Sequence, residues 1–142
     1  QAGEIPDHKL VLVGGKGWRD GPLTRLLEES AGRDVLSLGY VSDEHLPALY
    51  GGADLFVFPS LYEGFGMPVA EALACGTRVV CTDSPEIREA GGESPVYVEP
   101  TIEGIRRGIL EALDTERRSP AIRPRWTWED SARILADLLL RH

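Results

Sequence analysis

Residues 63–77 read EGFGMPVAEALACGT, and this stretch decides how the rest of the chain is interpreted. It begins as a glycine-rich loop and continues, over residues 67–75, as a predicted helix of small apolar side chains. That helix carries one charged residue, Glu71, and a buried carboxylate is costly unless a partner hydrogen-bonds to it. Free backbone N–H groups at the start of a helix can receive a phosphate or a hydroxyl-rich ligand. Glu63 and Glu71 therefore flank a candidate site for a sugar attached to a diphosphate.

Short apolar segments alternate with helical patterns along the rest of the chain. Strands are predicted over residues 9–14, 35–38, 55–59, 78–82 and 96–98. Helices are predicted over residues 22–31, 42–50, 67–75, 101–113 and 127–140, with a short additional helix that begins at Ser84-Pro85-Glu86. Strands without polar alternation, each followed by a helix, indicate a parallel sheet with helices on both faces. We therefore predict one α/β, Rossmann-like domain over residues 1–142, in which residues 119–142 form a connector and a closing helix.

Composition and charge narrow the class of protein. A chain of 142 residues with 42% hydrophobic and 27% charged residues is typical of a soluble globular domain, and no apolar run approaches the ~18 residues of a membrane span. The formal net charge of −8 argues against a nucleic-acid binder. Cys75 and Cys81 lie in or beside apolar segments, and we interpret them as reduced packing residues of a cytoplasmic protein. The three histidines show no metal-ligand spacing, so no metal site is predicted.

The two acids each have a plain and a functional interpretation. Glu71 is either an exposed acid in the second turn of its helix or a carboxylate that accepts two vicinal hydroxyls, such as those of a ribose. Glu63 is either a solvated loop acid or a group that binds sugar hydroxyls and stabilises positive charge developing on a sugar ring. Both functional interpretations require the acid to lie at the carboxyl ends of the strands, where parallel sheets bind their ligands.

The glycines between the two acids let the backbone approach a ligand closely. Gly64 and Gly66 have this role, and the N–H groups of Phe65, Gly66 and Met67 are the predicted donors. A glycine pair alone is weak evidence, but here a strand precedes it, a helix follows it and two acids flank it.

A second glycine-rich loop, GGKGWR at residues 14–19, follows the first predicted strand. Gly15 and Lys16 are candidate donor-site residues there, because Lys16 or Arg19 could supply a cation to a diphosphate. Ordinary loop charges are the alternative interpretation. The glycine spacing fits neither the dinucleotide fingerprint nor the P-loop, so neither a dehydrogenase nor an NTPase is supported.

These motifs together resemble one known family. Residues 63–80, EGFGMPVAE followed by ALACGTRVV, are similar to the E-x7-E signature of the family-4 retaining glycosyltransferases, which have the GT-B fold. Similar pieces occur in the family's order at 10–15 (LVLVGG), 38–46 (LGYVSDEHL), 50–60 (YGGADLFVFPS), 83–87 (DSPEI) and 126–132 (WTWEDSA). The resemblance covers nearly the whole chain and is to the carboxy-terminal, donor-binding half of that fold.

The resemblance implies roles for several residues. Glu71 would bind the ribose hydroxyls of a nucleotide-sugar. Glu63 would be the catalytic residue and would bind the donor sugar. The backbone of residues 65–67 would meet the sugar and the diphosphate, and the base would pack near Tyr40 and Val41. The family transfers the sugar with retention at the anomeric carbon, usually without a metal. GWRD at residues 17–20 resembles the mannosyltransferase-type members, which makes GDP-mannose the first expectation for the donor.

The chain also departs from the whole enzymes that it resembles. Those enzymes have a second, amino-terminal half that carries the acceptor site, and nothing in this sequence matches it. Nothing matches the first strand–helix unit of the donor half either, where the family carries an Arg and a Lys for the diphosphate. We expect the chain alone to be inactive, with a glycan or lipid-linked acceptor reached only through the missing half. An unpaired sheet edge, available for association, is expected where the missing strand belongs.

Three functions stay open on the sequence. The first is the donor-binding part of a glycosyltransferase, which the two intact acids favour. The second is a non-catalytic module that binds a sugar nucleotide or a partner. The third is another enzyme on the same fold, such as a sugar-nucleotide epimerase or a phosphorylase. A phosphorylase needs a lysine for pyridoxal phosphate, and Lys9 and Lys16 are the only lysines in the chain.

Overall fold

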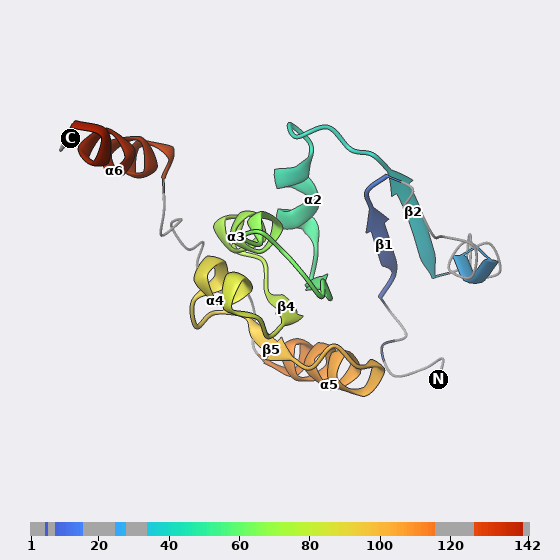
Figure 1. The fold of residues 1–142 in the computed structure, drawn as a ribbon. Helices are drawn as coiled ribbons and strands as arrows, with labels where there is room; N and C mark the ends of the chain where they lie inside the picture. The colour runs from blue at the N-terminus through green and yellow to red at the C-terminus, as the bar shows by residue number, and fades with distance from the viewer. Residues whose placement is uncertain (1–4, 6–7, 16–24, 28–33, 116–126, 141–142) are drawn as a thin grey trace. The chain divides into compact units, whose positions relative to one another are not determined.

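Strand β4 (Val79–Thr82) is the middle strand of a three-stranded parallel sheet and is buried along its whole length. In this computed structural model, which describes residues 5, 8–15, 25–27, 34–115 and 127–140, β4 pairs with β3 (Phe56–Phe58) and β5 (Val96–Val98) (Figure 1). The strand is apolar apart from its final threonine, as expected of a strand that is covered on both faces. All three strands were predicted, β3 with one residue too many at each end and β4 with one residue too many at its start.

Alternate side chains of β4 point to opposite faces of the sheet, and a separate apolar cluster forms on each face. Helices α3 (Met67–Ala74) and α4 (Pro85–Gly91) supply one cluster, in which Val69, Ala72, Leu73 and Ile87 pack with Val79 and Cys81. Helix α5 (Ile102–Asp114) supplies the other, in which Ala112 packs with Val80 and Val98. Helices on both faces of a parallel sheet confirm the predicted fold class.

Side-chain caps set the starts of three helices. The Ser84 hydroxyl accepts a hydrogen bond from the Ile87 N–H at 3.3 Å and begins α4, as predicted. Thr101 caps α5 through the Gly104 N–H at 3.0 Å. Thr127 caps α6 (Trp128–Leu140) through the Asp130 N–H at 3.1 Å. Both threonines were predicted inside their helices, and their extended or capping geometry instead places them one residue before the first turn.

Helix α5 approaches the sheet closely because of a glycine. A Cβ atom at Gly108 would lie 2.4 Å from Cγ1 of Val98 and 3.1 Å from Cγ1 of Val80, so a larger residue would collide with the sheet. At the end of the same helix, the Arg78 guanidinium donates to the carbonyls of Ala112 and Thr115, and its Nε donates to the carbonyl of Asp54 at 3.1 Å. This guanidinium satisfies carbonyls that the helix itself leaves unpaired.

The start of α2 differs from the prediction. A helix over residues 42–50 was expected with Ser42 as its cap, whereas α2 covers Leu46–Gly52 and residues 43–45 form a turn. The reason is Pro47, which has no N–H to donate to the carbonyl four residues earlier and therefore fits only in the first turn of a helix. The hydroxyl oxygen of Ser42 instead lies 2.7 Å from Nδ1 of His45.

The chain divides into two compact units, Gln1–Leu46 and Pro47–His142. In the first, β1 (Leu10–Val13) and β2 (Val35–Gly39) form a parallel pair that continues to a hydrogen bond from the Gly14 N–H to the Gly39 carbonyl at 2.8 Å. Of the helix predicted over 22–31, residues 25–27 are described and are helical. The assignment of residues 1–142 to one domain stays a prediction. None of the helices in the described part of the chain combines the length and apolarity that crossing a membrane requires.

Candidate functional site

The loop between β3 and α3 lies at the carboxyl edge of the three-stranded sheet. In a parallel sheet the residues that follow β3 and β4 emerge at the same edge, which is where such sheets bind ligands. A hydrogen bond connects the end of β4 to the loop that follows β3: the Thr82 hydroxyl donates to the carbonyl of Ser60. The Ser60 hydroxyl in turn donates to the Tyr62 carbonyl at 3.1 Å. The loop that carries Glu63 is therefore fixed to the sheet at its beginning.

Gly66 fixes the other end of the loop. It is the N-cap of α3, it is buried, and its φ of 86° lies in the left-handed region that favours glycine. A Cβ atom there would lie 3.5 Å from both Ile87 and Ala90, so α4 packs directly against this backbone. Gly64 is exposed and its surroundings are open. Close approach of a ligand to either glycine stays a prediction.

The start of α3 presents backbone donors. The first hydrogen bond of the helix runs from the Val69 N–H to the Gly66 carbonyl at 3.0 Å, and Pro68 has no N–H. Among the described residues, the N–H groups of Phe65, Gly66 and Met67 have no acceptor. These three were the donors predicted from the sequence, and together with the helix dipole they can receive an anionic or hydroxyl-rich group.

Glu71 is half-buried in the second turn of α3 and is held by a residue from another helix. The Tyr50 hydroxyl, from α2, donates to Oε2 of Glu71 at 3.1 Å. Burial and the adjacent Glu71 carboxylate raise the pKa of the Tyr50 phenol, so Tyr50 is a protonated donor at neutral pH. The plain interpretation of Glu71 as a simple exposed acid does not describe this environment.

Sequence reasoning assigned no role to Tyr50. The two residues are 21 positions apart and lie on different elements, so no local pattern connects them. The available signal was indirect: a carboxylate among apolar neighbours requires a donor, and a tyrosine before the strand that leads into the site can supply one.

Glu63 is half-buried in the loop before α3. In the part of the chain that the structure describes, no side chain or backbone group hydrogen-bonds to its carboxylate. A carboxylate in this position can accept hydrogen bonds from hydroxyl groups of a ligand.

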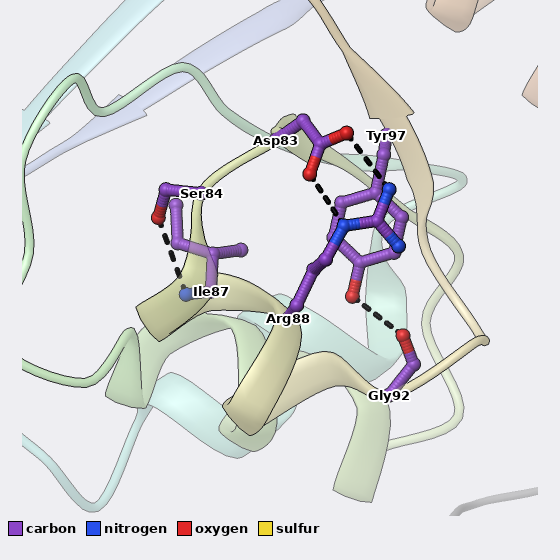
Figure 2. A network of polar contacts seen from close by, with 6 residues as sticks. All are labelled: Asp83, Ser84, Ile87, Arg88, Gly92 and Tyr97. Atoms are coloured by element: carbon purple, nitrogen blue, oxygen red, sulfur yellow. Dashed lines mark hydrogen bonds and ion pairs between the residues drawn. The ribbon is translucent and has the colours of Figure 1, made fainter.

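The turn after β4 is fixed by a polar network at the same edge (Figure 2). Arg88 donates to both carboxylate oxygens of Asp83, at 2.5 and 2.7 Å, and its guanidinium lies 4.3 Å from the centre of the Tyr97 ring. The Tyr97 hydroxyl donates to the Gly92 carbonyl at 2.7 Å. The hydrogen bonds from Arg88 lower the pKa of Asp83. This network holds α4, and α4 supports Gly66.

The second unit, Pro47–His142, contains both cysteines of the chain. Cys75 and Cys81 are both free, as predicted, and burial raises the pKa of the Cys81 thiol to about 12, which keeps it protonated. No group of three His, Cys, Asp or Glu side chains that could hold a metal ion occurs among the residues described here.

The remaining candidate residues belong to the first unit. Gly15 follows β1 and Tyr40 follows β2, so both lie at the carboxyl edge of the two-stranded sheet. Tyr40 is 79% exposed and Val41 is half-buried, so the tyrosine ring is accessible for stacking. Lys16 lies outside the described residues. The roles predicted for these four residues stay predictions.

Comparison with known proteins assigns a family to this arrangement. The family model described as "Glycosyl transferases group 1" matches residues 1–125. The O-antigen chain mannosyltransferase B of Escherichia coli is 40% identical over 111 residues, which are 77% of this chain and 29% of that protein. The mannosylfructose-phosphate synthase of Agrobacterium fabrum is 59% identical over 85 residues, 54% of this chain and 19% of that protein.

A solved structure shows the same fold. The sucrose-phosphate synthase of Thermosynechococcus elongatus superposes with a TM-score of 0.72 at 25% sequence identity, over 96% of this chain and 39% of that one. The chain thus spans less than two fifths of the length of each of these three proteins.

Proposed function

The chain belongs to the glycosyl transferases group 1 family, and from this we propose that it binds the nucleotide-sugar donor of a retaining hexosyltransferase. The observation that carries the proposal is the half-buried Glu71, whose carboxylate accepts a hydrogen bond from Tyr50. Glu71 lies one helical turn after the available backbone N–H groups at the start of α3. A site for a nucleoside diphosphate linked to a sugar requires this combination of hydroxyl acceptor and anion donors.

Each part of the donor then has a partner. Glu71 accepts the two ribose hydroxyls, and the N–H groups of Phe65, Gly66 and Met67 bind the diphosphate and the sugar. Glu63 accepts sugar hydroxyls and stabilises positive charge on the ring as the bond from the anomeric carbon to the diphosphate oxygen breaks. The electron pair of that bond leaves with the diphosphate. The acceptor hydroxyl oxygen forms the new bond on the same face of the sugar, and its proton passes to the departing diphosphate oxygen.

The donor is proposed to be GDP-mannose. Relatives that match this chain include an O-antigen chain mannosyltransferase and an MMP α-(1→4)-mannosyltransferase, the latter from Mycolicibacterium hassiacum, and these names support a mannosyl group. The assignment of Tyr40 and Val41 to the base, and of Gly15 and Lys16 to the diphosphate, stays a prediction from the sequence. No metal or other cofactor takes part in this proposal.

The acceptor is proposed to be a glycan or a lipid-linked glycan, bound by the amino-terminal half that the resemblance to the GT-B enzymes implies. The 142 residues by themselves are then proposed to bind the donor without transferring its sugar. We propose a cytoplasmic location, because free cysteines such as Cys75 and Cys81 stay reduced in that compartment.

Titration calorimetry of the chain with GDP-mannose, UDP-glucose and UDP-N-acetylglucosamine tests the proposal. GDP-mannose should bind, and Glu71→Ala should weaken its binding at least about tenfold, because hydrogen bonds to a charged group contribute ~1.5–3 kcal/mol. Glu111→Ala, which removes an exposed acid from α5, is the matched control and should bind like the unaltered chain. A folded chain that binds none of the three donors, or equal binding by Glu71→Ala, would contradict the proposal.

A further inference from the structure

Tyr50 is held at both its backbone and its ring. The Thr77 hydroxyl donates to the Tyr50 carbonyl at 2.6 Å, and Thr77 itself is 1% exposed and follows the turn that ends α3. The Tyr50 ring packs edge-on against Phe56 of β3, with ring centres 5.1 Å apart and planes at 86°. Two independent contacts therefore restrict the position of the phenol oxygen, and both come from elements that flank the candidate site.

That phenol oxygen meets a single carboxylate oxygen. It donates to Oε2 of Glu71 at 3.1 Å, and its one proton is used in this contact. Oε1 and the second lone pair of Oε2 keep their capacity to accept, which is the capacity that a vicinal diol needs. Without the tyrosine, the flexible Glu71 side chain would have to be ordered by the ligand at the time of binding, at a cost in affinity.

We propose that Tyr50 is a positioning residue that orients the Glu71 carboxylate toward the ribose hydroxyls of the donor without touching the donor itself. The inference rests on the function proposed above and adds to it a residue outside the loop and helix that form the site. Its basis is the hydrogen bond to Oε2, the contact with Phe56 and the bond from Thr77.

The test removes one hydroxyl and compares two ligands. Tyr50→Phe keeps the ring and its contact with Phe56 but loses the hydrogen bond to Glu71. The ligands are GDP-mannose and its 2′,3′-dideoxyribose analogue, titrated by calorimetry. Tyr50→Phe should weaken the binding of GDP-mannose about three- to tenfold, which is the range expected for the loss of one hydrogen bond. Binding of the dideoxy analogue should change by less than about twofold, since it lacks the hydroxyls that Glu71 accepts.

Two controls separate positioning from a general loss of structure. Thr115→Val removes a side-chain hydroxyl at the end of α5, which donates to the Ala112 carbonyl at 2.9 Å, and should affect neither ligand. In a Glu71→Ala background, Tyr50→Phe should have no further effect on GDP-mannose, because the group through which it acts is gone.

The failures are distinguishable. Equal weakening of both ligands by Tyr50→Phe, or a further loss in the Glu71→Ala background, would overturn the role of Tyr50 and leave the donor site in place. Failure of the unaltered, folded chain to bind GDP-mannose would overturn the proposed function, and the role of Tyr50 with it.

Discussion

The two faces of the β3–β4–β5 sheet are held in different ways. On the face covered by α3 and α4 the register aligns large aromatic residues with β4: Phe56 opposite Val79, Phe58 opposite Cys81 and Tyr97 opposite Cys81. Phe56 also contacts both Tyr50 and Phe58, with ring centres 5.1 and 5.9 Å apart. On the α5 face the sheet presents valines, and Gly108 brings the helix backbone close to them.

The polar contacts follow the same division. Around α3 and α4, single side chains are fixed by hydrogen bonds, as in Tyr50 to Glu71 and Arg88 to Asp83. Around α5, the described contacts to the sheet are apolar, and polar groups occur mainly at the helix ends, as in the Arg78 contacts. The difference indicates that the α3 face positions individual chemical groups, whereas the α5 face supplies close packing. Variants on the two faces should therefore affect different measurements.

Gly108→Ala should disrupt the packing of α5 against the sheet and should have the largest effect on stability. The added methyl would overlap the Val98 side chain at 2.4 Å, and overpacking of this kind costs ~1–3 kcal/mol. The helix gains up to about 1 kcal/mol from replacing glycine. Because valine side chains are stiff, the overlap should outweigh this gain, and the free energy of unfolding in urea should fall by up to about 2 kcal/mol.

Binding measured on folded Gly108→Ala sharpens the comparison. Its affinity for GDP-mannose should equal that of the unaltered chain at a temperature where both are folded, whereas Glu71→Ala should lose affinity. Arg107→Ala, an exposed change on the same helix, is the control for stability. A stability equal to or above that of the unaltered chain would show that the α5 face accommodates the methyl group.

Arg78→Ala should have the next largest effect on stability. Its guanidinium bridges the carbonyls of Asp54, Ala112 and Thr115, and loss of a cation at a helix carboxyl end costs ~0.3–2 kcal/mol. We expect a loss of about 1.5 kcal/mol in chemical unfolding. Arg78→Lys keeps the charge but offers one nitrogen in place of a fork, so it should recover less than half of the loss. Full recovery by lysine would mean that charge alone accounts for the effect.

Ser84→Ala tests the cap of α4 and should have a smaller effect. The hydroxyl accepts from the Ile87 N–H, and removal of such a cap costs ~1 kcal/mol. Ser84→Asp, which keeps an acceptor and adds a charge at the positive end of the helix, should restore stability in the same unfolding measurement. Because α4 packs on Gly66, a chain without the cap should also bind the donor slightly more weakly. If Ser84→Ala and Ser84→Asp were equally stable, the cap would have no measurable value.

Much of this fold could be predicted because its signals are local. Apolar runs bounded by glycine, proline or aspartate located β3 and β4 to within one residue, and Ser84-Pro85-Glu86 located the start of α4. The start of α2 was missed because the capping potential of Ser42 was weighed without the missing N–H of Pro47. That error was also local and could have been avoided.

The contacts that define the candidate site depend on tertiary structure, and this is why sequence reasoning could not supply them. Glu71 was recognised from its apolar surroundings, but its partner Tyr50 is brought to it only when α2 and α3 pack around β3. The left-handed φ of Gly66 and its contact with Ile87 likewise require α4 in place. The motif located the acids, whereas the residues that hold them come from other elements.

The Asp83–Arg88 pair should give the smallest effect, visible mainly as a pH dependence. Hydrogen bonds from Arg88 lower the pKa of Asp83 in the folded chain below its unfolded value of ~3.9. Such a group stabilises the fold fully above the unfolded pKa, and the contribution is lost as the pH falls through the folded pKa. The pair is exposed and screened by solvent, so its effect on the unfolding midpoint at pH 7 should be small.

Thermal unfolding of the unaltered chain and Asp83→Asn at pH 7 and pH 2.5 tests this sign. The unaltered chain should have the higher midpoint at pH 7, and the gap should shrink at pH 2.5, because the contribution of the carboxylate is lost as the pH falls through the lowered pKa of Asp83. Arg88→Gln, which leaves the carboxylate but removes its donor, should show the same convergence. A gap that is as large at pH 2.5 as at pH 7 would mean that the carboxylate charge adds nothing, and that packing of Arg88 on Tyr97 alone holds this edge of the α4 face.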